Sequence, residues 1–284
     1  MPFTRAQLRA RVFSDLGQQA GADNELLTAA EVNEALTLGE QQFARDTRCF
    51  RRTALLRAVD GQAVYRLPED LCKVISLTCG EDPAPLTEGD EFWYAKNVPS
   101  YRSTGAGAPR TWWMHTAAEC RLYPPPAVSA PAALSADAYC VPLAVGGGIA
   151  ALAWAGGTVT VTTAYRHGLR AGDAVAISGA APAGYDGVFT VDVTGDTTFT
   201  CPLAVDPGAG SGGAVAYAGG CLPMLADSDV SPIDFGYQLA IAHFAAWWLS
   251  ANHLAGDPVA QASGNNALLK YEALARQYEE ARWL

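Results

Sequence analysis

Two segments near the amino terminus have the spacing of polar and apolar residues that is typical of helices. Thr4 stands three residues before Gln7, the capping-box pattern that begins a helix. The same spacing joins Thr28 to Glu31, and the helix that follows is expected to run to about Arg48. Along one side of this second helix fall Val32, Leu36, Gly39, Gln42 and Phe43.

Alternating apolar and polar residues then predict strands as far as residue 140. The run "RTALLRAV" meets Asp60-Gly61, a strong hairpin turn, and "QAVYRL" returns from it. A second hairpin is predicted for "RTWWMH" with "CRLYP", and single strands for "CKVISLTC" and "AALSADAYC". Between them, "TEGDEFWYAKN" predicts a short helix before a loop that contains glycine and proline.

The last part of the chain predicts two further helices. Ser231-Pro232 and Asp257-Pro258 each place a capping residue before a proline at the first helical position. The first of these helices, over 232–251, is apolar on two sides, which indicates burial on several sides or a membrane span. Its polar side chains would be costly in lipid, so we expect it to lie between its own sheet and a neighbouring subunit. The candidate subunit-interface residues are Tyr237, Ile241, Phe244, Trp247 and Trp248.

Residues 141–220 differ in composition from the rest of the chain. They carry 2 Lys and Arg and 5 Asp and Glu, whereas residues 1–140 carry 14 and 17. The alternation in "GGTVTVTTAYRHGL", "DAVAISG", "GVFTVDV" and "TTFTCPL" predicts short strands joined by turns, as in an all-β sandwich or small barrel. The similar phrases "YCVPL" and "CLPML" at the two edges suggest a domain inserted into a host.

The predicted fold class is therefore α+β. Residues 1–140 and 221–284 form a discontinuous host domain, a helical bundle with antiparallel β-hairpins. Residues 141–220 form an inserted all-β domain. With 284 residues, the chain is long enough to bury a core in each domain.

The stretch "HGLRAGDAVAISGAAPAGYDGVFTV" contains the residue types of a catalytic loop, but its pattern is typical of turns. His167 ends a predicted strand, and Asp173 and Asp186 stand beside glycines in turns. No nucleophile motif accompanies the histidine, and the aspartates lack the spacing of a calcium loop. The seven cysteines show no C-x-x-C pair, so reduced and mostly buried thiols are expected. We therefore assign no catalytic, cofactor-binding or metal-ligating residue and predict that the chain is not an enzyme.

The host segments resemble the head-to-tail adaptor proteins of tailed bacteriophages, also called connector or head-completion proteins. The phrases that carry the resemblance are "TAAEVNEALTLGEQQFARDTRCFRRTALLRAVDGQAVYRLPEDLCKVISL", "GAPRTWWM", "CRLYPPP" and "LADSDVSPIDFGYQLAIAHFAAWWL". The middle block, from Thr163 to Phe199, is similar to a small β module that recurs in phage structural proteins. This second likeness leaves the ligand of the module open.

The resemblance implies a mechanical role in the virion. Adaptors form a ring, usually twelve-fold, beneath the portal, where they extend the DNA channel and give the tail its platform. The implied partners are the portal protein, a downstream tail or tail-completion protein and further copies of the chain, with no membrane involved. The implied location is the head-tail interface of the virion, after synthesis in the host cytoplasm. The net charge of -10 agrees with genomic DNA that passes without sequence-specific binding.

Two groups of residues are candidates for contacts with these partners. The portal-contact candidates, at the end of the predicted C-terminal helix, are Tyr278, Arg282, Trp283 and Leu284. The basic-run candidates are Arg45, Arg48, Arg51, Arg52 and Arg57. This basic run is either a helix end with strand residues paired to carboxylates, or a contact with an acidic portal surface or channel DNA.

One alternative function also fits the sequence. The chain would then be a tail or baseplate component whose β insert binds a host glycan or another tail protein.

Overall fold

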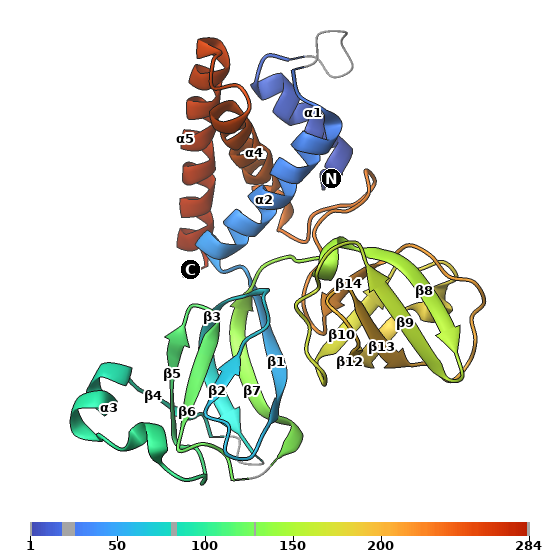
Figure 1. Ribbon diagram of the computed structural model, residues 1–284. Helices are drawn as coiled ribbons and strands as arrows, with labels where there is room; N and C mark the ends of the chain where they lie inside the picture. The colour runs from blue at the N-terminus through green and yellow to red at the C-terminus, as the bar shows by residue number, and fades with distance from the viewer. Residues whose placement is uncertain (1, 19–25, 81–83, 128, 283–284) are drawn as a thin grey trace. The chain divides into compact units, whose positions relative to one another are not determined.

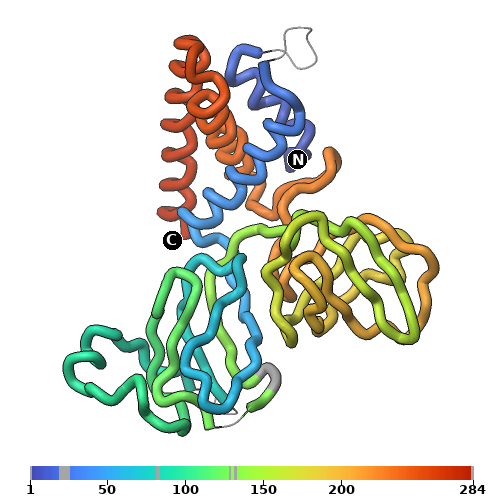
Figure 2. The backbone as a smooth tube through the Cα atoms, viewed as in Figure 1, coloured from blue at the N-terminus to red at the C-terminus, as the bar shows by residue number. Residues whose placement is uncertain are grey.

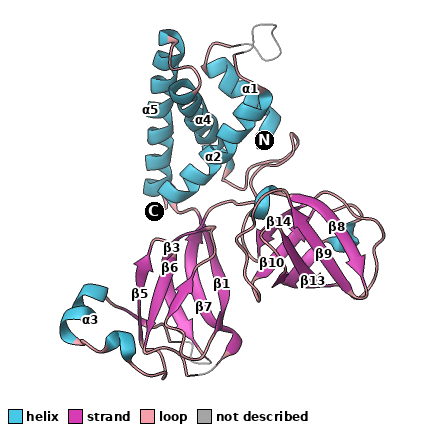
Figure 3. Cartoon of the chain, viewed as in Figure 1, coloured by secondary structure: helices cyan, strands magenta, loops and turns pink. Residues whose placement is uncertain are grey.

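Figure 1 shows the computed structural model, which describes residues 2–18, 26–80, 84–127 and 129–282. The chain divides into two compact units, and each is described by itself. The helical unit comprises Met1–Phe50, Val141–Leu143 and Cys221–Leu284. The β unit comprises Arg51–Cys140 and Ala144–Gly220. The colours of Figure 2 allow the chain to be followed through these alternating segments, and Figure 3 shows where helices and strands gather.

The helical unit is built around one central helix. Its helices are α1 (Arg5–Asp15), α2 (Ala29–Thr47), α4 (Gln238–Asn252) and α5 (Pro258–Ala281). The other three helices all pack against α4 (Figure 1). Their shared core holds fully buried apolar side chains such as Leu8, Leu36, Phe43, Ile241 and Leu249.

Both predicted capping boxes are confirmed. The Thr4 hydroxyl accepts a hydrogen bond from the Gln7 amide at the start of α1. At α2 the Thr28 hydroxyl accepts from the Glu31 amide, while the Glu31 carboxylate accepts from the Thr28 amide. The helix ends at Thr47, close to the predicted end.

The predicted start of the third helix at Pro232 is wrong. The Asp234 carboxylate accepts a hydrogen bond from the Gly236 amide and begins a short 3-10 turn, η4 (Phe235–Tyr237). The regular helix α4 begins only at Gln238, after this turn. The predicted cap at Asp257 is confirmed, because its carboxylate accepts hydrogen bonds from two backbone amides at the start of α5.

The two apolar sides of α4 are covered by helices of its own unit, not by the expected sheet. Two glycines allow the close approach. A Cβ on Gly39 of α2 would lie 2.7 Å from the Ile241 carbonyl oxygen, and one on Gly264 of α5 would lie 1.8 Å from the Ser250 hydroxyl. The all-round apolar pattern therefore reflects a helix buried among α1, α2 and α5.

Residues 51–140 of the β unit hold two sheets. One has the strand order β1-β7-β3, and the other has the order β2-β6-β5-β4. The strands are β1 (Phe50–Ala58), β2 (Val64–Arg66), β3 (Leu71–Cys79), β4 (Thr87–Glu88), β5 (Thr111–Thr116), β6 (Glu119–Tyr123) and β7 (Ala130–Cys140). The predicted short helix is confirmed as α3 (Glu91–Asn97), and a 3-10 turn, η1 (Tyr101–Ser103), follows it.

The predicted β5–β6 hairpin is confirmed, but the predicted hairpin at Asp60-Gly61 is wrong. Strands β5 and β6 pair antiparallel, with Thr111 opposite Tyr123. By contrast, β1 pairs with β7 and β2 pairs with β6, so the strands that flank Asp60-Gly61 lie in different sheets. Gly61 does adopt the left-handed conformation of a tight turn, with φ of 72°.

Residues 144–220 contribute two more antiparallel sheets to the β unit. Their strand orders are β11-β10-β14 and β12-β13-β9-β8. The strands are β8 (Ile149–Ala155), β9 (Thr158–Thr163), β10 (Ala174–Ser178), β11 (Gly187–Thr190), β12 (Asp192–Val193), β13 (Thr198–Pro202) and β14 (Ala214–Tyr217). Two 3-10 turns accompany them, η2 (Val145–Gly147) and η3 (Ala183–Tyr185). The class α+β is thus correct, since five α-helices and four sheets are described.

Independent folding of the predicted insert stays a prediction, and one contact shows how to test it. The Leu143 amide donates a hydrogen bond of 3.0 Å to the Cys221 carbonyl, so residues 144–220 leave and return at adjacent points. Joining Leu143 to Cys221 through a short Gly/Ser linker is expected to give a soluble protein that keeps its helical circular dichroism. Aggregation with loss of the helical signal would contradict the insertion model.

Candidate assembly surfaces

His167 and its neighbouring aspartates are used within the fold. The Leu169 amide donates to His167 Nδ1 at 3.0 Å, so Nε2 carries the proton and donates to the Thr198 carbonyl at 3.3 Å. The Asp173 carboxylate accepts from the Arg170 amide, and burial raises its pKa. Asp186 accepts from the Ala180 amide at 2.9 Å. Both aspartates thus make the backbone bonds predicted for turn residues.

Two buried thiols have strongly altered acidity. Burial raises the pKa of Cys120 to about 12 and that of Cys201 to about 11. Both thiols therefore stay protonated at neutral pH, in which form they are poor nucleophiles and poor metal ligands. Over the described ranges, no His, Cys, Asp and Glu side chains gather in a group of three or more that could hold a metal ion. Nor does any helix in those ranges have the length and apolar character needed to cross a membrane.

The five subunit-interface candidates differ in how much surface they leave. Ile241 is fully buried in the helical unit, so its side chain has no surface to offer a neighbouring chain. Phe244 packs against Trp247 and Tyr271, with ring centroids 5.3 Å apart in each case. The half-buried candidates are Tyr237, Phe244, Trp247 and Trp248. An interface through these four stays a prediction.

The described portal-contact candidates hold α5 against α2. The Tyr278 ring packs edge-on against Phe43 and Tyr237, at centroid distances of 5.7 and 4.9 Å. The Arg282 guanidinium donates to the Thr47 and Arg48 carbonyls at 3.3 and 3.2 Å. A cation is favourable at this helix end, where carbonyl groups lack partners within the helix. Trp283 and Leu284 lie outside the described residues, and a portal contact at these four positions stays a prediction.

The basic run divides between paired and exposed arginines. Arg51 forms an ion pair with Asp137 across the β1–β7 contact, and Arg52 forms one with Asp70. Those two pairs match the interpretation of strand arginines paired to carboxylates. The other members, Arg45 in the last turn of α2, Arg48 after it and Arg57 on β1, are all exposed. The alternative contact with a portal or with DNA stays a prediction for these three.

The Arg52–Asp70 pair is buried, and sequence reasoning did not single out Asp70. Arg52 Nε lies 2.7 Å from one carboxylate oxygen and its terminal nitrogen 2.5 Å from the other, with both side chains under 5% exposed. The guanidinium also donates to the Ala218 carbonyl at 3.4 Å and lies 5.3 Å from the Tyr217 ring centre. The signal that could have found Asp70 is its place in the phrase "YRLPEDL", directly before β3.

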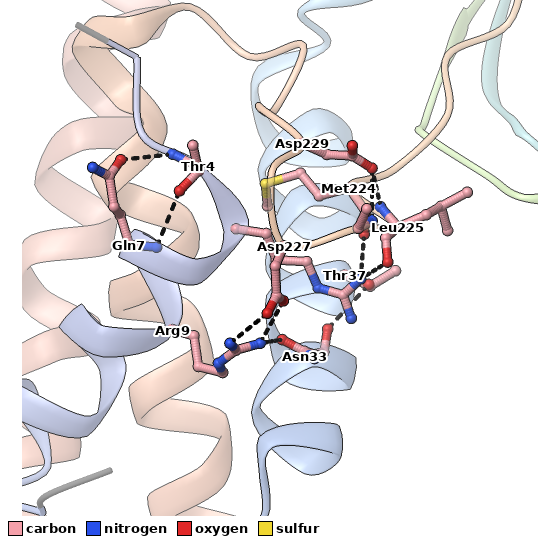
Figure 4. A network of polar contacts seen from close by, with 11 residues as sticks. Thr4, Gln7, Arg9, Asn33, Thr37, Met224, Leu225, Asp227 and Asp229 are labelled. Atoms are coloured by element: carbon pink, nitrogen blue, oxygen red, sulfur yellow. Dashed lines mark hydrogen bonds and ion pairs between the residues drawn. The ribbon is translucent and has the colours of Figure 1, made fainter. Parts of the chain in front are cut away.

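A second polar network, which the sequence did not reveal, holds the loop 224–230 to α1 and α2 (Figure 4). The Arg5 guanidinium donates to the Met224 and Leu225 carbonyls. Arg9 makes a two-pronged ion pair with Asp227, at 2.7 and 2.8 Å. The loop therefore enters the helical unit through several specific contacts (Figure 4).

Glu40 of α2 bonds to the same loop from inside the helical unit. Its carboxylate is fully buried and accepts from the Met224 amide at 3.0 Å. Burial raises the pKa of Glu40 to about 7, although hydrogen bonds from Ser231 and Met224 act in the opposite direction. The raised pKa brings the Glu40 carboxyl, inside the helical unit, close to neutral pH.

Comparison with known proteins gives one family match. Residues 3–186 match the family described as SU10 adaptor protein, and no curated protein matches the chain. The match spans α1, α2, the two sheets of residues 51–140 and part of the later β segment. It confirms the resemblance to a phage head-tail adaptor, while the likeness of Thr163–Phe199 to a separate β module is not tested by it. Because the matched range covers more than half of its residues, the chain belongs to the SU10 adaptor protein family.

Proposed function

We propose that this chain is a structural virion protein that forms the ring between portal and tail. In this position it extends the DNA channel and offers the tail its attachment platform. Membership of an adaptor family, over residues 3–186, is the observation that carries the proposal. The role is mechanical and requires no reaction chemistry.

The charge of the chain is consistent with DNA transit. A protein with 29 acidic and 19 basic residues repels phosphate overall, and phosphate contacts would add affinity that slows a sliding duplex. The Arg51 and Arg52 charges are further offset by their carboxylate partners. Genomic DNA is therefore a passing neighbour of the proposed ring, with no sequence-specific contact.

The portal contact is proposed for the end of the chain. Tyr278 and Arg282 tie the end of α5 to α2. Trp283 and Leu284 would then reach the portal, with roughly 2 to 3 kcal/mol for each side chain that becomes buried. Repetition around a ring makes even a modest contact tight. The neighbouring subunits would meet through the half-buried aromatic residues of α4 and η4.

Mixing the purified protein with its portal tests the proposal. Electron micrographs are expected to show a stoichiometric ring directly beneath the portal. A protein that lacks only Trp283 and Leu284 should fail to bind, because it keeps the Tyr278 and Arg282 contacts but loses the proposed anchors. The matched control, Arg45→Gln with Arg48→Gln, should still form the ring.

Two results would contradict parts of this proposal. A truncated protein that binds the portal normally, together with loss of binding in the arginine control, would move the contact to the basic run. Density at the far end of the tail instead of beneath the portal would contradict the ring role itself. It would favour a tail or baseplate component whose β insert binds a glycan or another tail protein.

A further inference from the structure

A cavity of about 720 Å³ lies within the β unit, and three arginine side chains are among the residues that line it. Arg66 comes from β2, while Arg166 and Arg170 come from the segment between β9 and β10. We call this space the arginine cavity. Its volume is within the usual range of protein ligand sites, about 300 to 1,000 Å³.

The positive charge in the arginine cavity is concentrated there against the trend of the sequence. Residues 141–220 contain only two basic residues, and these are Arg166 and Arg170. Both line the same cavity, in a chain whose net charge is -10. The segment between β9 and β10 carries both arginines and brings them beside Arg66.

The arginines differ in whether a carboxylate already engages them. Arg66 pairs with Glu69 and Arg166 with Asp196, each at 2.6 Å. All four side chains are at least 40% exposed, so these pairs contribute little stability and a ligand can open them. Within the described residues, no carboxylate forms an ion pair with the Arg170 guanidinium, although its charge acts on the neighbouring Asp173 carboxylate.

The turns that carry these side chains are held in place. The buried His167 ring bonds to the Leu169 amide and the Thr198 carbonyl, and the His167 amide donates to the Asp196 carbonyl at 3.1 Å. Gly168 has φ of 63°, and a Cβ there would lie 2.5 Å from Glu69 Oε1. The cavity wall is therefore formed before any ligand arrives, which lowers the ordering cost of binding.

The lining selects a ligand class. Guanidinium groups bind carboxylates and phosphates through paired hydrogen bonds. Glu69 and Asp196 also line the cavity and call for hydrogen-bond donors from the ligand, which a phosphodiester backbone does not have. A protein segment can offer carboxylates to the arginines and, at the same time, amide or amine donors to the two carboxylates.

We propose that the arginine cavity binds a carboxylate-rich segment of a partner protein. This inference goes beyond the ring role and does not depend on where the ring lies in the virion. It gives the β unit a part in docking, through the guanidinium groups of Arg66, Arg166 and Arg170.

Fluorescence anisotropy of the full chain with a short labelled peptide of alternating glutamate and glycine tests this proposal. The Arg170→Gln variant is expected to weaken peptide binding about tenfold, because it removes charge-assisted hydrogen bonds. Arg276→Gln, an exposed change on α5 with the same loss of charge, should leave the affinity unchanged. Asp196→Asn should strengthen binding about threefold, because it removes the carboxylate that competes for Arg166.

Several results would overturn the proposal. These are absence of peptide binding to the unaltered chain, equal losses in Arg170→Gln and Arg276→Gln, and weaker binding in Asp196→Asn. A single-stranded oligonucleotide of equal charge that binds more tightly, with the same dependence on Arg170, would reassign the cavity to nucleic acid. Thermal unfolding of each variant checks its fold, and Arg166→Gln, whose side chain is 80% exposed, provides a second loss-of-binding variant.

Discussion

Replacing Asp70 by asparagine is expected to destabilise the β unit by about 3 to 5 kcal/mol. The change would leave the Arg52 guanidinium buried without its carboxylate, at a position that is only 4% exposed. The contacts with the Ala218 carbonyl, at 3.4 Å, and with the Tyr217 ring, at 5.3 Å, would remain, but neither supplies a negative charge to Arg52.

Urea unfolding followed by circular dichroism measures this loss. Asp137→Asn is the matched control, because it removes the carboxylate from the neighbouring Arg51 pair, in which the arginine is 60% exposed. Its cost should be much smaller, since water solvates the arginine that remains. Replacing both Arg52 by methionine and Asp70 by leucine should recover most of the loss, because no unpaired charge is then buried. Equal costs for Asp70→Asn and Asp137→Asn would refute the argument.

The features predicted correctly from sequence are those whose causes lie within a few residues. Thr4 and Thr28 begin helices because each hydroxyl bonds to an amide three residues later, and that spacing is visible in the chain. The β5–β6 hairpin joins strands separated by a short turn, so its register follows from local alternation. Such local signals describe elements well and say little about which elements meet.

Long-range pairing explains the errors. The turn at Asp60-Gly61 forms, yet β1 finds its partner in β7, a strand that comes after most of residues 51–140. Turn chemistry predicts that the chain reverses, not which strand lies alongside. In the same way, the apolar pattern of α4 predicts burial on two sides but not that α1, α2 and α5 provide the cover.

The same contrast between local signals and long-range contacts applies to the candidate contact residues. The sequence shows the arginines of the basic run as a cluster. Whether Arg51 and Arg52 are paired depends on Asp137 and Asp70, which lie outside that cluster. The arginine cavity depends on β2 meeting the segment after β9 and the turn between β12 and β13, which no spacing in the sequence reveals. Sequence reasoning therefore finds candidate side chains, and tertiary contacts determine which of them remain available to a partner.

Glu40 provides the second large effect, a pH dependence of stability in the helical unit. In the folded protein burial raises the pKa of Glu40 to about 7, whereas the ordinary value of 4.5 applies to the unfolded chain. The folded state therefore holds the proton more tightly. The stability that this group contributes is fully present below pH 4.5 and is lost as the pH rises through about 7.

The Glu40→Gln variant should abolish this pH dependence. The amide keeps an acceptor for the Met224 amide but never becomes charged, so stability at pH 8 should rise by about 3 kcal/mol relative to the unaltered chain. At pH 4.5 the difference should be small, because the protonated carboxyl and the amide have similar shape and polarity. Neighbouring charges on Arg5 and Asp229 act in opposite directions and do not change the sign of the pKa shift.

Urea unfolding of the helical signal at both pH values measures the effect, with Glu34→Gln, an exposed change on the same helix, as the control. An equally small change in Glu40→Gln and Glu34→Gln at pH 8 would contradict the prediction. It would mean that water solvates the Glu40 carboxylate in the folded protein and that its pKa is not raised.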